Sequence, residues 1–188
     1  MTSTRTTYPA DNWIAHNLIA DYLGPWPPSS GPRHPGPDTV KEHTVIEIEI
    51  EPLYTTEAIA TGGGRNGHVR TADGRVDMDL AIPAEMGGSG DGANPEQLFA
   101  AGYAACFHSA LQSVARQAKK KLGDSSVGAR VSIGKAGEGF GLAVTLEVVI
   151  PDLPQDEAQQ LADAAHQVCP YSNATRGNIR VDVQVVDD

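Results

Sequence analysis

The stretch NPEQLFAAGYAACFHSALQSVARQAKKK, from Asn94 to Lys121, predicts one long helix around which the rest of the chain is organised. Asn94 is a favourable N-cap, Pro95 suits the first helical position, and Gln97 completes a capping box. Small and bulky apolar residues alternate around the whole helix, which is typical of a helix at the centre of a fold. Gly123 is the expected C-cap.

Composition limits the classes of protein and partner. A chain of 188 residues with 40% hydrophobic content predicts one domain plus an appendage. The net charge of -10 and the lack of a basic stripe argue against nucleic acid and anionic membranes as partners. No apolar run approaches the roughly 18 residues of a membrane span. The N-terminus MTSTRTTYPADNW is unlike a secretory signal, so a cytoplasmic location is expected.

The N-terminal quarter differs from the remainder. Residues 11–23 predict a short amphipathic helix, and the proline-dense residues 24–38 predict an extended linker. We therefore divide the chain into an extension at 1–45 and a domain at 46–188. The extension is expected to lie across its own domain or, alternatively, to serve as a docking segment for another protein.

Alternation of apolar and polar residues predicts a series of strands, at 44–51, 54–61, 68–71, 75–82, 127–133, 142–150 and 179–185. Asn66-Gly67 predicts a hairpin turn, and residues 83–93 predict a loop. A second helix is expected at 154–168, stopped by Pro170. Strands grouped before and after two helices indicate an α+β fold with antiparallel sheets.

Cys106 is the first candidate catalytic residue. Its apolar helical surroundings should raise the thiol pKa and leave it inert unless the fold supplies a cation. Arg65 is the best candidate for that cation, because it lies at the tip of a glycine-rich hairpin. Arg70 and Arg75 are alternatives, and an ordinary exposed loop arginine is another interpretation of Arg65.

Glu96 is a candidate partner that would orient a buried arginine, although a glutamate in a first helical turn also has an ordinary role. Glu96 and Cys106 are ten positions apart. On one straight helix they would be about 15 Å apart along the axis. A shared site therefore requires a bent helix start or a glutamate from a second copy, and the second case predicts a homodimer with sites at its interface.

Cys169 follows the second helix, where the helix dipole disfavours a thiolate, so it is the weaker candidate nucleophile. It could resolve an oxidised Cys106 through a disulfide if the fold brings the two together. Two unrelated buried thiols fit the same spacing.

Two further patterns carry less weight. Gly62-x-Gly64-x-x-Gly67 matches a dinucleotide fingerprint, but a hairpin follows where a helix is required. A zinc site formed by His166, Cys169, Cys106 and His108 is disfavoured, because Cys106 and His108 face different sides of their helix. We expect neither a cofactor nor a metal.

Two long segments resemble the organic hydroperoxide resistance branch of the Ohr/OsmC superfamily. They are NPEQLFAAGYAACF at 94–107 and AHQVCPYSNATRGNI at 165–179, and the segments GGGRNG and DGRVDMDLAIP agree with them. The resemblance covers roughly residues 53–186 and leaves the extension outside the family core.

This resemblance implies an intertwined homodimer in which antiparallel sheets wrap paired central helices, with active sites at the subunit interface. It also implies the roles of four residues. Cys106 is similar to the peroxidatic cysteine and Cys169 to the resolving one, while Arg65 and Glu96 match the pair that sets the thiolate. The implied partners are an organic hydroperoxide and a dithiol reductant, either a lipoylated protein or dihydrolipoamide.

The resulting hypothesis is a metal-free thiol peroxidase that reduces organic hydroperoxides to alcohols. The disulfide between Cys106 and Cys169 would form in each cycle and be reopened by the external dithiol. The main alternative is a non-catalytic redox sensor or binding protein that uses the same disulfide to switch a partner through the N-terminal extension. A plain binding module with structural thiols is a third possibility.

Overall fold

The computed structural model describes residues 50–187. The chain divides into two units, residues 1–51 and 52–188, and the second unit contains every element described below. The helix predicted at 11–23 and the linker at 24–38 lie outside the described residues. The strand predicted at 44–51 does so too, except for residues 50–51, which have no regular structure.

The first sheet is an antiparallel meander of β1 (Ala58–Gly63), β2 (Asn66–Thr71) and β3 (Asp77–Asp79). Its hairpin turn is Gly64-Arg65, because Gly63 pairs with Asn66. The prediction of a turn at Asn66-Gly67 was therefore wrong. Gly64 provides the left-handed backbone, with φ 64°. Gly67 is needed for another reason, since a Cβ there would lie 2.0 Å from the carbonyl oxygen of Thr61.

The segment between the first sheet and the long helix is more structured than predicted. The strand predicted at 75–82 is regular only over β3, although Leu80 forms an isolated bridge with Ala93. The loop at 83–93 includes one turn of 3-10 helix, η1 (Ala84–Met86).

The long helix α3 (Pro95–Gln117) begins as predicted. The backbone N–H of Gln97 donates to Asn94 Oδ1 (2.9 Å), and the N–H of Asn94 donates to Gln97 Oε1 (3.0 Å). The predicted C-cap was wrong, because the helix ends at Gln117 and Ala118 is its C-cap. Lys119 takes the left-handed conformation directly after it, with φ 55°, while Gly123, also left-handed, lies farther along the chain. The N–H of Lys120 then donates to the carbonyl of Ala115, which closes the last turn.

The second sheet has the order β4 (Ser126–Ala136), β5 (Gly139–Val149) and β6 (Arg180–Val185). β4 and β5 form the predicted antiparallel hairpin, but β6 is parallel to β5. The physical reason is the connection, because α4 (Gln155–Val168) carries the chain back along the sheet before β6 begins. The α+β class is confirmed, with one parallel pair that the sequence did not indicate.

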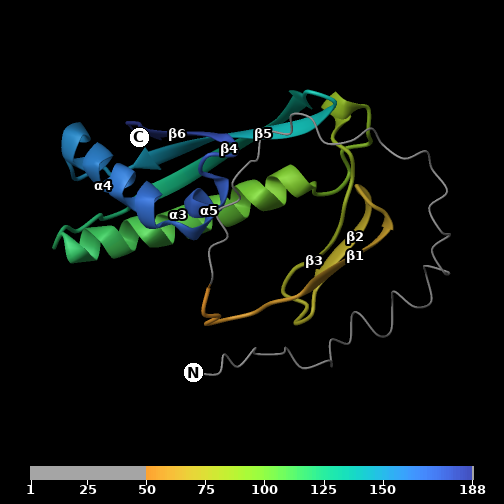
Figure 1. Cartoon of the computed structure of the whole chain (residues 1–188), viewed down its shortest axis with the longest axis horizontal. Coiled ribbons are helices and arrows are strands. Elements are labelled where there is room, and N and C mark those ends of the chain that lie inside the picture. The colour runs from red at the N-terminus through yellow and green to blue at the C-terminus, as the bar shows by residue number, and fades with distance from the viewer. Residues whose placement is uncertain (1–49, 188) are drawn as a thin grey trace, which may run out of the picture. The chain divides into compact units, whose positions relative to one another are not determined.

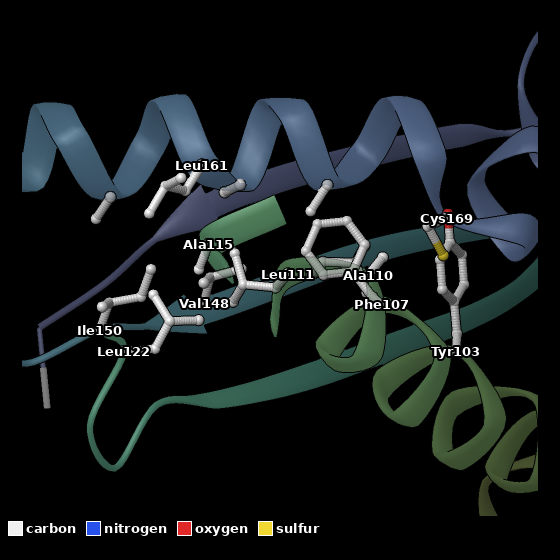
Figure 2. Close-up of a cluster of buried hydrophobic side chains, with 14 of the residues drawn as sticks. Tyr103, Phe107, Ala110, Leu111, Ala115, Leu122, Val148, Ile150, Leu161 and Cys169 are labelled. Atoms are coloured by element: carbon white, nitrogen blue, oxygen red, sulfur yellow. The ribbon is translucent and has the colours of Figure 1, made fainter. Parts of the chain in front are cut away.

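Helices α3 and α4 lie along one face of this second sheet, as Figure 1 shows. A continuous apolar core fills the space between them (Figure 2); its largest fully buried side chains include Tyr103, Phe107, Leu111, Leu146, Val144 and Val148. Within the described chain, however, α3 is covered on one side only. Ala101, Ala105 and Ser109 form an exposed row on the other.

Pro170 ends α4 as predicted, but it also occupies the first position of a short helix, α5 (Pro170–Thr175), which the sequence did not predict.

Within residues 50–187, none of the helices combines the length and the apolar character needed to cross a membrane.

Candidate active site

The two cysteines face each other across the α3–α4 interface. Their sulfur atoms are 3.6 Å apart, and both residues are free thiols. Cys169 is completely buried, whereas Cys106 is partly exposed. The structure thus brings together the two cysteines that the sequence analysis selected, at a separation from which a disulfide needs only a small movement.

Helix geometry explains the position of Cys169. The residue is the C-cap of α4 and the N-cap of α5, so both helices fix its backbone. Its N–H donates to the carbonyl of Ala165 (2.9 Å), and its own carbonyl accepts from Asn173 N–H (2.9 Å). Small buried residues on α4, such as Ala158, Ala162 and Ala165, let that helix approach α3 closely.

The electrostatic surroundings of Cys106 disfavour a thiolate within one chain. Burial raises the pKa of the Cys106 thiol above its usual value, and the neighbouring Cys169 raises it further. A hydrogen bond from the backbone N–H of Tyr171 acts in the opposite direction. Among the described residues, no cation is hydrogen-bonded to this sulfur. An additional positive charge is therefore needed if Cys106 is to react quickly at neutral pH.

Arg65 and Glu96 form a second pair. Two parallel hydrogen bonds, of 2.8 and 2.6 Å, join the guanidinium to the carboxylate. This contact lowers the pKa of Glu96 and raises that of Arg65. Glu96 is largely covered, with 14% of its side chain exposed, against 35% for Arg65. The bidentate geometry fixes the guanidinium plane, as expected for an arginine that must be oriented.

The alternative arginines do not compete for Glu96. Arg75 forms an ion pair with Asp73 at 3.5 Å, and its side chain is 87% exposed. Arg70 is exposed on β2 and forms no ion pair within the described part of the chain. Of the three candidates, Arg65 is thus the one that meets the glutamate.

The four predicted residues form two separate pairs rather than one cluster. Glu96 lies in the first turn of α3, and the helix runs without interruption past Cys106. Ten residues of continuous helix place the two about 15 Å apart along the axis. The bent helix start considered above is therefore absent, and Arg65 makes no polar contact with either sulfur.

A cavity of about 430 Å³ opens beside Cys106 on the exposed side of α3. Its walls are mostly small or apolar; they are formed by Cys106, Ser109, Ala110, Ser113, Gln117, Val168 and Pro170. Cys106, which is partly exposed, is therefore accessible from this cavity.

A network of buried hydroxyl groups, which the sequence patterns did not predict, lies next to the thiols. The hydroxyl of Tyr103 lies 3.0 Å from Ser172 Oγ and 3.2 Å from Thr175 Oγ1. Ser172 Oγ also lies 2.9 Å from His166 Nδ1. The sequence spacing could have indicated this network. Tyr103 precedes Cys106 by three residues and Ser172 follows Cys169 by three, so each hydroxyl group is close in sequence to one of the thiols.

The histidines considered as zinc ligands have other contacts. His166 contacts Ser172, and His108 Nε2 lies 3.1 Å from Ser125 Oγ. The described residues contain no group of three or more His, Cys, Asp or Glu side chains arranged to hold a metal ion.

Comparison with known proteins places this geometry in a family. Residues 88–184 match the model of the OsmC-like protein family. An organic hydroperoxide resistance protein from Xanthomonas axonopodis pv. citri is 55% identical over 131 residues, which cover 69% of this chain and 92% of that protein. The chain belongs to the OsmC-like family.

Within the OsmC-like family, the chain falls in the organic hydroperoxide resistance branch. OhrB of Bacillus subtilis is 45% identical over 135 residues, covering 71% of this chain and 98% of OhrB. The crystal structure of an organic hydroperoxide resistance protein from Legionella pneumophila matches with a TM-score of 0.69 and 54% identity. That match covers 72% of this chain and 98% of the Legionella chain. The OsmC-like fold predicted from the sequence is confirmed.

The histidine of the hydroxyl network makes stability depend on pH. Burial, and then the charge of Arg176, lower the pKa of His166 below 6.5, against an opposing effect of Asp163. The unfolded chain therefore binds this proton more readily, and stability should fall as the pH drops below about 6.5. In urea unfolding between about pH 8 and about pH 5, His166→Gln should lose less stability than the wild type.

His68 provides the opposite control. Hydrogen bonds to Asp79 and Asp77 raise the pKa of His68. The stability that His68 contributes to the fold is therefore present at low pH and is lost as the pH rises through the folded-state pKa. His68→Gln should therefore lose more stability on acidification than the wild type. Equal pH slopes for the wild type and His166→Gln would contradict the assignment.

Proposed function

We propose that this protein is a cysteine-based peroxidase that reduces organic hydroperoxides to alcohols. The observation that carries the proposal is the pair of free thiols 3.6 Å apart, one buried and the other at the wall of a cavity. A reactive thiol needs access to substrate, and a resolving thiol needs only access to the first sulfur. Cys106 and Cys169 meet these two requirements respectively.

In the first step, the Cys106 thiolate attacks the distal oxygen of the hydroperoxide. The O–O bond breaks, the alkoxide leaves and takes a proton to become the alcohol, and Cys106 becomes a sulfenic acid. The N–H of Tyr171 donates to the attacking sulfur and so favours its anionic form.

In the second step, the sulfur of Cys169 attacks the Cys106 sulfenic acid. The S–O bond breaks, an S–S bond forms, and the thiol proton of Cys169 leaves with the hydroxide as water. An external dithiol then reopens the disulfide by exchange. We propose a dihydrolipoyl group as this reductant on the basis of the family resemblance. Because the cycle needs both thiols reduced, we place the enzyme in the cytoplasm.

The cavity supports an organic substrate. Ala110, Val168 and Pro170 contribute apolar wall beside the reactive sulfur. An alkyl chain gains free energy by leaving water for such a surface, and hydrogen peroxide has no apolar surface to bury. The names of the relatives from Xanthomonas and Bacillus agree with this substrate class.

We further propose that a second copy of the chain supplies the activating cation. The Arg65–Glu96 pair lies at the start of α3, too far from Cys106 of the same chain to act on its sulfur. Two copies with their α3 helices side by side and antiparallel would bring each pair to the partner's Cys106. The exposed row of Ala101, Ala105 and Ser109 allows such close helix packing.

Substitution of the resolving cysteine tests the division of roles. Cys169→Ser should react with about one equivalent of cumene hydroperoxide and then stop, because no disulfide can form. Intact mass should show Cys106 gaining one oxygen and, with excess peroxide, two or three. Cys106→Ser is the matched control and should consume no peroxide. Continued turnover by Cys106→Ser would remove Cys106 as the nucleophile.

Mixed dimers test the shared site. Arg65→Ala should slow the reaction of Cys106 with peroxide by at least about tenfold. This is the factor by which the thiolate fraction falls when the pKa of the thiol rises by about one unit. Cys106→Ser should be inactive. A heterodimer of these two variants, purified through two different affinity tags, contains one intact site if the sites are shared. It should therefore recover about half of the wild-type activity.

The control heterodimer replaces Arg65→Ala with Arg75→Ala, because Arg75 is exposed and pairs with Asp73. It should show about half of the wild-type activity wherever the arginine acts. If the Arg65→Ala/Cys106→Ser heterodimer shows no activity above its two parents, each site lies within one chain. If Arg65→Ala alone reacts at the wild-type rate, Arg65 does not activate the thiol.

A further inference from the structure

The buried hydroxyl network joins the same two segments as the thiol pair. Tyr103 and Cys106 lie about one turn apart on α3, while Cys169 and Ser172 are three residues apart at the start of α5. The Tyr103–Ser172 contact of 3.0 Å therefore runs beside the Cys106–Cys169 contact of 3.6 Å. Tyr103 and Cys169 are drawn together at one end of the core in Figure 2.

The network is completely buried at its centre and fully hydrogen-bonded. Tyr103 and Ser172 have no exposed surface, and no buried polar side-chain atom of residues 50–187 lacks a partner. Thr175 Oγ1 donates to the carbonyl of Tyr171 (2.9 Å), so it accepts from the hydroxyl of Tyr103 (3.2 Å). Tyr103 then accepts from Ser172, which in turn accepts from the Nδ1–H of a neutral His166. The chain of hydroxyls ends on α4, so it connects α3, α4 and α5.

Disulfide formation requires a small movement of α5 toward α3. The sulfurs must approach from 3.6 Å to about 2.05 Å, a movement of about 1.5 Å. Cys106 sulfenic acid that waits too long for this approach is open to a second peroxide molecule, which oxidises it irreversibly to the sulfinic acid. The fraction of protein that survives each cycle depends on how well Cys169 is held in place.

We propose that Tyr103, Ser172 and His166 are positioning residues that hold Cys169 against Cys106 for disulfide formation. The inference rests on the proposed function, because it concerns the second step of that cycle. The hydroxyl groups touch neither the peroxide nor the reacting sulfurs. They act by fixing the α5 segment to α3, so that the thiol of Cys169 stays within reach of the sulfenic acid.

Removal of one hydroxyl tests the inference. Tyr103→Phe keeps the aromatic ring but removes its hydrogen bonds to Ser172 and Thr175. After one equivalent of cumene hydroperoxide, disulfide closure should be about five- to tenfold slower than in the wild type, the factor expected for the loss of these two weak hydrogen bonds. With excess peroxide, mass spectrometry should show a larger overoxidised fraction. The rate of the first step should remain unchanged.

Ser125→Ala is the matched control. It removes a hydroxyl from the other polar cluster on α3, where Ser125 contacts His108 (3.1 Å) and Gln112 (3.2 Å) without reaching α5. Closure should keep the wild-type rate in this variant. If Tyr103→Phe and Ser125→Ala close their disulfides equally fast, the inference is wrong.

A double variant separates positioning from stability. In Tyr103→Phe, Ser172 keeps its contact with His166, whereas Tyr103→Phe/Ser172→Ala also leaves His166 Nδ1 without that contact. The double variant should therefore be less stable to urea than Tyr103→Phe, yet close its disulfide at about the same rate, because the link from α5 to α3 is already broken in the single variant. A closure rate that falls further, in step with stability, would show a purely structural role. If Tyr103→Phe does not fold, Ser172→Ala replaces it in the same measurements.

A measurement without peroxide separates this inference from the proposed function. At equilibrium with reduced and oxidised dithiothreitol, the disulfide of Tyr103→Phe should be about five- to tenfold less favoured than that of the wild type. If the wild-type protein does not react with cumene hydroperoxide but its disulfide is still more favoured than that of Tyr103→Phe, the proposed function is overturned and the positioning role stands. No difference from Ser125→Ala would overturn the positioning role.

Discussion

The close packing of α4 against α3 is the constraint on which the proposed chemistry depends. Alanines at 158, 162 and 165 bring the two helices together, and α4 ends at the point where Cys169 meets Cys106. A larger residue at any of these positions would push the helices apart and so move Cys169 away from Cys106. The core therefore sets the distance between the thiols as well as the stability of the fold.

The same burial has opposite consequences for the two steps of the proposed cycle. It raises the pKa of Cys106, which protects the thiol from adventitious chemistry and makes an activating cation necessary. It also buries Cys169 completely, so that the sulfur of Cys106 is the one thiol group within its reach. In our account, the activating charge comes from the partner chain, while the resolving thiol comes from the same chain and is held by its own hydroxyl network.

Sequence patterns predicted the parts of the structure that depend on local interactions. The capping box at Asn94, the β4–β5 hairpin and the extent of α4 follow from residues close together in the chain. The parallel pairing of β6 and the short helix α5 depend on tertiary packing, which leaves little local signal. The same holds for the site: residue type selected both cysteines, whereas only the fold could show that the hydroxyls of Tyr103 and Ser172 meet.

Free thiol content and intact mass, measured before and after one equivalent of cumene hydroperoxide without added reductant, show whether the two cysteines form a redox pair. We predict the loss of both thiols and a mass lower by about that of two hydrogen atoms, with a disulfide joining Cys106 to Cys169. Folded, reduced protein that keeps both thiols after this treatment would contradict the account, because Cys106 would then be an inert residue of the core.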